Sequence, residues 1–374
     1  MASIDELLGE FEQVANDPKK VLDDYVAAGK RVIGVGPYYV PEELVHAAGA
    51  VPFGVWGARG AAVKAKEYFP PFYCSICQMS LEMGLNHQLD KLSGMMITGL
   101  CDTLKAFSQN WKAGVEGVPM IYVSHPQNRK IPAGRTYAIE SYREVKQQVE
   151  ECCGAIIDDD ALHASIKLYN EWRAAMREFV TLAATHPAEV SNAARAAVID
   201  AGYFLSKDEH LAKVKALNEA LSAAPASQDG HHPILVSGIY DDIPDVLGML
   251  DDYGYNVVAD DLAKESRAFA VQVPEEGDPI EALADAWCAI DGDSILFDPE
   301  KKHVDLVVEK AKESGAKGVV IFLAKFCDPE EFEAPLVTKA VRAAGMSCIT
   351  IEVDQSTESY EQARTQLETF KDLF

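Results

Sequence analysis

Cysteines are the residues of this chain best suited to chemistry, and four of the eight have an informative setting. Cys74 and Cys77 form a C-x-x-C pair where a proline-led turn enters a predicted helix. A helix N-terminus favours the thiolate, which is the form of cysteine that binds metal. Cys101 and Cys327 each lie at or just past the end of a predicted strand, and each is followed by an aspartate. Taken alone, the C-x-x-C pair fits a redox dithiol, half of a zinc site or coincidence.

The kind of site follows from which ligands are present and which are missing. Several thiolates without histidines at ligand spacing suit an iron–sulfur cluster better than catalytic zinc. A thioredoxin-like dithiol would leave Cys101 and Cys327 without a role. The remaining cysteines are interpreted as packing residues, because free cysteine behaves as a small buried hydrophobe. They are Cys152, Cys153, Cys288 and Cys348.

Two halves of the chain repeat one order of elements, and these elements must position the cysteines. Short apolar runs, several ending in glycine, predict buried parallel strands, and helical stretches separate them. The predicted strands span 30–36, 51–56, 93–100 and 118–123 in the first half, and 233–238, 255–260, 316–323 and 346–353 in the second. Such alternation predicts an α/β fold with two doubly wound, Rossmann-like or flavodoxin-like parallel sheets.

Domain limits follow from the same pattern. We expect an N-terminal α/β domain over 1–135 with Cys74 and Cys101, a mainly helical connector over 136–228, and a C-terminal α/β domain over 229–374 with Cys327. The polar stretch from Ser222 to His232 is the expected linker. Ligands of open parallel sheets bind at the carboxyl ends of the strands. If the two domains face each other, Cys101 and Cys327 can therefore point into one cleft.

Composition limits the class of protein. The formal net charge of −25 repels nucleic acid and anionic membranes. No apolar run reaches the ~20 residues that cross a bilayer, and the acidic, amphipathic N-terminus is unlike a signal peptide. We therefore expect a cytoplasmic protein that binds neither nucleic acid nor membrane. A nucleotide cofactor is not supported, because neither half opens with a G-x-G-x-x-G or phosphate-binding loop.

Several segments in register resemble the 2-hydroxyacyl-CoA dehydratase family, and in particular its beta subunits. They are 36–52, 72–82, 100–105, 326–331 and 353–356, and the similarity extends over essentially the whole chain. The resemblance implies a heterodimer with a homologous alpha subunit, and a [4Fe–4S] cluster on three cysteines of each subunit. In this chain the family pattern falls on Cys74, Cys101 and Cys327. Cys77 is not a fixed cysteine of that pattern, which leaves open whether it supplies a fourth ligand.

The implied reaction is a radical elimination of water from an (R)-2-hydroxyacyl-CoA, with (R)-2-hydroxyglutaryl-CoA as the expected substrate, to the (E)-2-enoyl-CoA. The β-hydrogen of a 2-hydroxyacyl thioester is too weakly acidic for an ordinary side-chain base. One electron added to the thioester carbonyl gives a ketyl radical that expels the α-hydroxyl and acidifies the β-proton. The resemblance implies that an ATP-dependent iron–sulfur activator supplies the electron. The beta cluster then relays it to the substrate site of the alpha subunit, so this chain has no assigned catalytic residue.

Alternative functions stay open at this point. One is a homodimeric, ATP-driven double-cluster reductase of the same superfamily, and another is a non-catalytic metal-binding partner subunit. A plain C-x-x-C oxidoreductase is a third. The family leaves room for a flavin in the complex, although no feature of this sequence supports one.

Overall fold

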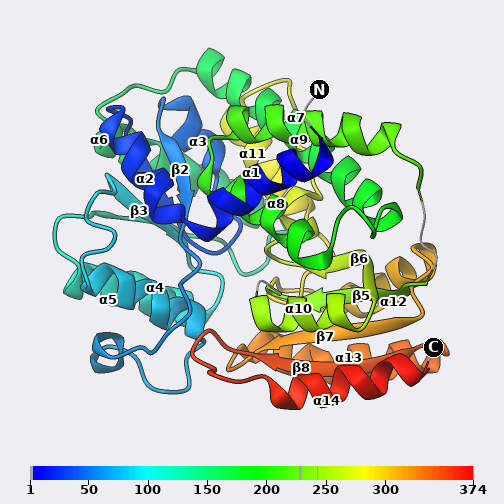
Figure 1. The fold of residues 1–374 in the computed structure, drawn as a ribbon. Helices are drawn as coiled ribbons and strands as arrows, with labels where there is room; N and C mark the ends of the chain where they lie inside the picture. The colour runs from blue at the N-terminus through cyan, green and yellow to red at the C-terminus, as the bar shows by residue number, and fades with distance from the viewer. Residues whose placement is uncertain (1–2, 227–229, 242, 374) are drawn as a thin grey trace.

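The computed structural model describes residues 3–226, 230–241 and 243–373. Within them the chain forms two four-stranded parallel sheets, ordered β2-β1-β3-β4 and β6-β5-β7-β8. The predicted α/β fold with two parallel sheets is confirmed. Figure 1 shows the first sheet in blue and cyan, the second in yellow-green to red, and a group of green helices beside both.

The first sheet has short, fully or largely buried strands separated by helices. Its strands are β1 (Val32–Val35), β2 (Val51–Gly54), β3 (Gly94–Thr98) and β4 (Met120–Val123). Its helices are α3 (Glu42–Ala47), the 3₁₀ turn η1 (Lys64–Glu67), α4 (Ser75–Leu85) and α5 (Asp102–Gly114). All four predicted strands of this half are present, because continuous apolar runs are the mark of strands buried on both faces.

The second sheet repeats this order. Its strands are β5 (His232–Gly238), β6 (Tyr255–Leu262), β7 (Gly318–Ala324) and β8 (Ser347–Val353). Its helices are α10 (Pro244–Asp252), η2 (Ser266–Phe269), α11 (Pro279–Ala289), α12 (Lys302–Glu313), α13 (Asp328–Ala343), α14 (Glu361–Phe370) and η3 (Lys371–Leu373). The first two strands of each sheet pair in the same way, and β3 and β7 hold equivalent positions.

Helices from both ends of the first half pack together beside the sheets. They are α1 (Ile4–Asn16), α2 (Pro18–Ala27), α6 (Pro132–Cys153), α7 (Asp159–Thr185), α8 (Asn192–Phe204) and α9 (Lys207–Ala223). A capping box between Ser3 and Glu6 starts α1, and the Asp158 carboxylate caps α7. Helix α1 packs against α8 and α9. The expected linker from Ser222 to His232 includes residues 227–229, which lie outside the described residues.

The hydrophobic cores cross the expected domain limits, which stay a prediction. Ile280, Leu283 and Trp287 of α11 share a core cluster with Ile33 of β1 and with residues of α6. Tyr38, Trp56 and Ile76 in turn pack into the core of the second sheet. The two α/β units are therefore packed through side chains from both. In the described part of the chain, no helix has both the length and the apolar character needed to cross a membrane.

Candidate metal centre

Cys101 and Cys327 occupy equivalent places in the two sheets. Cys101 follows β3 and is the N-cap residue of α5, and Cys327 follows β7 and is the N-cap residue of α13. The Cys101 sulfur accepts the backbone N–H of Leu104 at 3.5 Å. The aspartates Asp102 and Asp328, which follow these cysteines, are not the N-caps. Each aspartate is the first residue of its helix, where a negative charge also interacts favourably with the helix dipole.

Cys74 is the N-cap residue of α4 and lies at a junction between the two halves of the chain. The hydroxyl of the next residue, Ser75, accepts the backbone N–H of Gln355 at 3.1 Å. The Gln355 side-chain amide donates to the Trp56 carbonyl at 2.8 Å. A turn of the C-terminal half is therefore bonded to the residue beside Cys74.

The structure brings the predicted cysteines into electrostatic contact. Burial raises the pKa of Cys101 to about 12, and the charge of Cys74 adds to this rise. Burial, Glu330 and the charges of Cys74 and Cys101 raise the pKa of Cys327 well above its usual value. The three thiols, at the N-termini of α4, α5 and α13, thus lie in one region, in which the charge of Cys74 disfavours the ionisation of the other two.

Cys77 differs from these three in its role. It is buried on α4, and its thiol donates a hydrogen bond to the Cys74 sulfur. That bond, together with the N–H groups of Ile76 and Cys77, holds the pKa of Cys74 below its usual value despite burial. The same bond, burial and the charge of Cys74 raise the pKa of Cys77 well above its usual value. Cys77 therefore favours the thiolate of Cys74.

The donor set suits a cluster better than a single ion. Among the described residues, no three histidine, cysteine, aspartate or glutamate side chains gather closely enough to hold one metal ion. A four-iron cluster is larger than one ion and spreads its thiolate ligands around itself. Free thiols that repel one another, with helix N–H groups directed at their sulfurs, are what a cationic iron core stabilises. The residues present fit such a cluster.

An aromatic wall, made of Tyr38 and Trp56, borders the thiols, and no strong sequence pattern predicted it. Burial, Asp293, Cys327 and Cys101 raise the pKa of Tyr38 well above its usual value, which places its ring near these groups. Tyr38 stacks on Trp56 with 5.9 Å between ring centroids. The only sequence feature that pointed to Tyr38 is its position directly after β1, in the run Gly36-Pro-Tyr-Tyr39.

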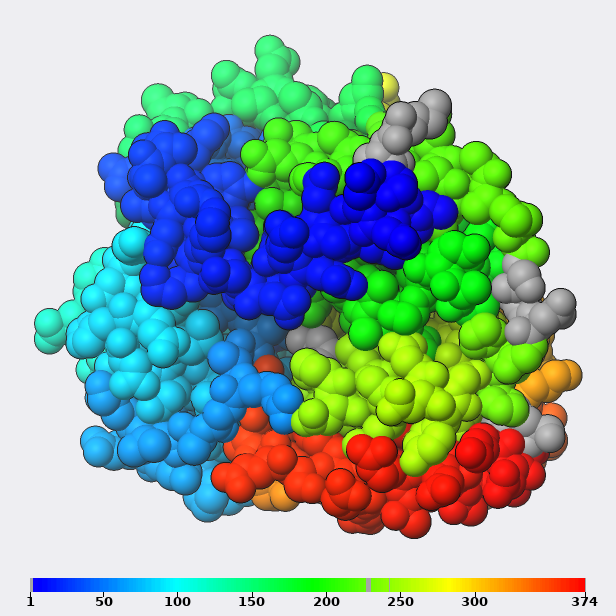
Figure 2. Space-filling view, viewed as in Figure 1, coloured from blue at the N-terminus to red at the C-terminus, as the bar shows by residue number. Residues whose placement is uncertain are grey.

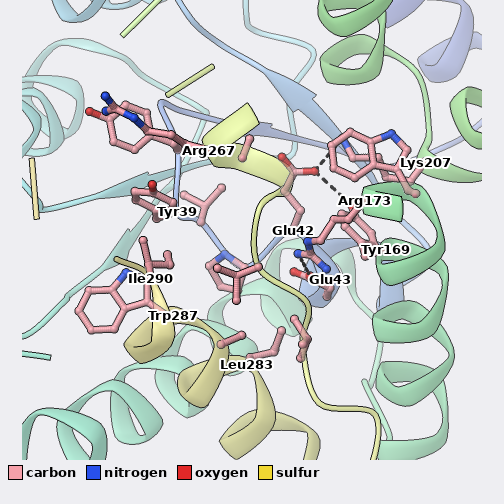
Figure 3. A pocket seen from close by; sticks show the side chains of 18 of the residues that line it. Tyr39, Glu42, Glu43, Tyr169, Arg173, Lys207, Arg267, Leu283, Trp287 and Ile290 are labelled. Carbon is pink, nitrogen blue, oxygen red and sulfur yellow. Dashed lines mark hydrogen bonds and ion pairs between the residues drawn. The ribbon is translucent and has the colours of Figure 1, made fainter. Parts of the chain in front are cut away.

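Two hollows flank this wall. One of about 840 Å³ is lined by Trp56, Gln355 and residues of α1, α2, α8 and α10. Figure 2 shows the molecule hollowed between the N-terminal helices, in dark blue, and α10, in yellow-green. The other is a cavity of about 120 Å³ behind Tyr38 and Tyr39. Figure 3 shows Arg267 and Tyr39 at one end of it, and Arg173 and Lys207 at the other.

The charged groups of the smaller cavity are paired. Arg173 bonds Glu43 at 2.5 Å, and Lys207 pairs with Glu42 at 3.0 Å. The Lys207 ammonium also lies 4.6 Å from the centroid of the Trp172 ring. The first pair joins α3 to α7 and the second joins α3 to the start of α9, so neither offers an unpaired charge to a ligand.

The other cysteines lie away from the three thiols. Cys152 and Cys153 end α6 and pack against the first sheet, and Cys348 lies in β8. Cys288, on α11, packs against the same core as Cys152. His125, which follows β4, is buried against Trp287, and burial lowers its pKa to about 3. It is a neutral packing residue.

Comparison with known proteins points to one family. The family model described as "2-hydroxyglutaryl-CoA dehydratase, D-component" matches residues 37–373. The beta subunit of (R)-2-hydroxyglutaryl-CoA dehydratase from Acidaminococcus fermentans is 46% identical, and the match covers 98% of this chain and 99% of that protein. The beta subunit of (R)-phenyllactyl-CoA dehydratase from Clostridium sporogenes is 39% identical, with all of both chains covered. The beta subunit of lactoyl-CoA dehydratase from Anaerotignum propionicum is 38% identical, also with all of both chains covered.

Proposed function

This chain belongs to the 2-hydroxyglutaryl-CoA dehydratase D-component family, and from that premise we propose that it is the iron–sulfur beta subunit of a 2-hydroxyacyl-CoA dehydratase. The enzyme would be a hydro-lyase that removes water from an (R)-2-hydroxyacyl-CoA and forms the (E)-2-enoyl-CoA. One observation carries the proposal: Cys74, Cys101 and Cys327, far apart in sequence, lie at the N-termini of three helices, and the charge of Cys74 raises the pKa of both other thiols.

The names of the relatives support a 2-hydroxyacyl group in the substrate. Their names contain 2-hydroxyglutaryl, phenyllactyl and lactoyl groups, which all carry a hydroxyl beside the thioester and differ beyond it. The higher identity to the 2-hydroxyglutaryl protein, 46% against 39% and 38%, favours (R)-2-hydroxyglutaryl-CoA. A homologous alpha subunit is the expected partner, because all three relatives are named as beta subunits.

The bound cluster would supply one-electron transfer, from an ATP-dependent activator toward the alpha subunit. Cys74, Cys101 and Cys327 would hold it. The N–H of Leu104 at Cys101 and the N–H of Glu330 at Cys327 would stabilise the thiolate charge. Tyr38 and Trp56 cover the site and exclude water from one side, since both are buried. A cytoplasmic location belongs to this proposal.

The ligand assignment is tested by anaerobic purification and analysis of iron and acid-labile sulfide. Cys74→Ala, Cys101→Ala and Cys327→Ala should each lose the cluster absorbance, because a three-ligand site loses one thiolate. Cys288→Ala is the matched control, since this cysteine is also partly buried but lies in another core. Full iron content in Cys101→Ala would exclude the assignment.

The subunit assignment is tested by turnover. The purified chain with activator, ATP and reductant should not dehydrate (R)-2-hydroxyglutaryl-CoA until the homologous subunit is added. Turnover by this chain alone would place the active site here and favour the homodimeric alternative. Purification of a single homologous partner in equal amount would support the heterodimer.

A further inference from the structure

Arg267 lies at the centre of a buried charge network directly behind Cys327. It belongs to η2 and is buried. Its guanidinium binds the Asp261 carboxylate through two hydrogen bonds, from Nη2 at 2.8 Å and from Nε at 3.1 Å. Asp261 lies in β6, so the arginine is fixed to the second sheet. Two parallel bonds hold the plane of a guanidinium in one orientation.

One arm of the network reaches the turn that carries Cys327. Arg267 Nη1 donates to Ser294 Oγ at 3.1 Å and lies 3.7 Å from Glu330 Oε1, and Ser294 donates to the same carboxyl oxygen. Glu330 is the third residue of α13, and its backbone N–H bonds the Cys327 sulfur. Its side chain is only 4% exposed, so it turns inward instead of toward solvent.

The Cys327 turn needs such an anchor, because its backbone is strained. Phe326, the residue before Cys327, has a φ of 62°. A bulky side chain in this left-handed region is strained and persists only where the surroundings enforce it. The N–H of Cys327 bonds Ala324 at 2.9 Å, which closes the turn locally. The link from Arg267 to Glu330 holds the following helix against it.

The second arm reaches the turn after β1, in the other half of the chain. Asp293 Oδ2 accepts the Tyr39 hydroxyl at 2.6 Å and lies 3.6 Å from Arg267 Nη1. Tyr39 also has a positive φ, of 65°. Its neighbour Tyr38 packs edge to face against it and borders the thiols of Cys101 and Cys327. Figure 3 shows Arg267 and Tyr39 on the same side of the cavity.

We propose that Arg267 is a positioning residue of the cysteine site, which holds the Cys327 turn and the Tyr38–Tyr39 turn in one fixed arrangement. It acts through Glu330 and Asp293 and not through a bond of its own to a cysteine sulfur. The two turns come from different halves of the chain and both are strained. Local sequence alone therefore does not fix the position of one turn relative to the other. This inference rests on the proposed function only in taking the group that Cys327 binds to be an iron–sulfur cluster.

The test is the accessibility of Cys327 in folded, iron-free protein, measured by its alkylation rate with iodoacetamide and mass spectrometry. Arg267→Lys keeps the charge but loses the two-bond geometry. We expect it to label Cys327 at least threefold faster than the unmodified chain. Arg195→Lys is the matched control. Arg195 is equally buried and pairs with Asp260 at 2.5 Å and with Glu265, but bonds neither Glu330 nor Asp293. It should leave the Cys327 rate unchanged.

Two milder variants keep the inference falsifiable if Arg267→Lys does not fold. Tyr39→Phe removes one arm and Ser294→Ala weakens the other, and each should raise the labelling of Cys327 by a smaller factor. Unchanged labelling in every folded variant, or equal acceleration by Arg195→Lys, would overturn the proposal.

A second measurement uses the iron-loaded chain. Arg267→Lys should change the electron paramagnetic resonance spectrum of the reduced protein, and Arg195→Lys should not. Absence of iron from the unmodified chain would instead refute the proposed function, and the labelling result would still decide the role of Arg267.

Discussion

His303 gives the sharpest prediction about the pH dependence of stability. It lies on α12, almost fully buried, with Nε2 2.7 Å from Asp261 and Nδ1 2.7 Å from Glu333. Arg267 and Lys301 are the cations nearby: Arg267 Nη2 lies 2.9 Å from His303 Nε2, and Lys301 pairs with Glu333 at 2.7 Å. Burial opposes protonation, but the charge and hydrogen bond of Asp261 and the hydrogen bond of Glu333 prevail. They raise the pKa of His303 to about 9.

The magnitude follows from linkage. Because the pKa in the folded state is about 9 against an ordinary 6.5, protonated His303 stabilises the fold by about 3 kcal/mol. A raised pKa means that this contribution is fully present below about pH 6.5 and is lost as the pH rises through 9. For a chain of 374 residues, unfolding entropy near 0.8 kcal/mol per kelvin converts this to roughly 4 °C of thermal midpoint.

The perturbation is His303→Gln, and the assay is the thermal midpoint at several pH values from 6 to 10. Glutamine keeps hydrogen bonding but cannot carry the charge. At pH 6 the thermal midpoint of the variant should lie below that of the unmodified chain by about 4 °C, in addition to the decrease caused by poorer packing of the glutamine. At pH 10 only the decrease caused by packing should remain. His87→Gln is the control, because His87 pairs with Asp90 on the surface with its side chain 75% exposed. A difference for His303→Gln that stays constant over this pH range would show that the buried imidazole is not charged.

Three further outcomes follow from the structure. Arg195→Met should cost about 3–5 kcal/mol, because it leaves the buried carboxylates of Asp260 and Glu265 without their partner, and calorimetry at constant pH measures this. Gly238→Ala should destabilise the second sheet, since φ is 147° and an added Cβ would lie 2.2 Å from the Phe322 carbonyl oxygen. Gly248→Ala, with open space at its Cβ on α10, should instead be neutral or stabilise by up to about 1 kcal/mol in urea unfolding. Anaerobic removal of iron should lower the thermal midpoint, because a bound group stabilises the folded arrangement by mass action. It should increase proteolysis between the two halves with little change in far-ultraviolet circular dichroism, because the strands pair within each sheet and not between the sheets. Identical midpoints and cleavage patterns with and without iron would contradict a cluster shared by both halves.

The strands could be predicted because each is a short apolar run with a clear end. The predicted span 316–323 matches β7, Gly318–Ala324, within two residues at its start and one at its end. The same logic placed Cys101 and Cys327 after equivalent strands. That each cysteine is also the N-cap of the following helix could not be predicted, because the aspartate after it is the commoner capping residue.

Packing between distant segments could not be predicted in the same way. Helix α11 lies in the second half of the sequence, but in the folded chain it packs against α6 and the core of the first sheet. Arg267 lies in the run Glu265-Ser-Arg-Ala-Phe269, where an arginine ordinarily points to solvent. Its burial depends on Asp261 and Asp293, which reach it from separate elements.

The buried network is more than a source of stability, because burying charges is expensive. The network has four acidic groups, Asp261, Asp293, Glu330 and Glu333, and three basic ones, Arg267, His303 and the exposed Lys301. Burial raises the pKa of Glu330, which reduces the excess of negative charge. A well-packed apolar cluster of the same volume often stabilises a fold as well or better. The contacts within an apolar cluster are not directional, so they do not hold one side chain at a set distance and orientation from another. The network ends at Glu330, whose N–H bonds the Cys327 sulfur, and at Tyr39, beside the ring that covers the thiols. The hydrogen bonds of the network therefore hold in place the two turns that border the candidate centre. For this reason, loss of Arg267 should change the labelling rate of Cys327, whereas loss of the equally buried Arg195 should not.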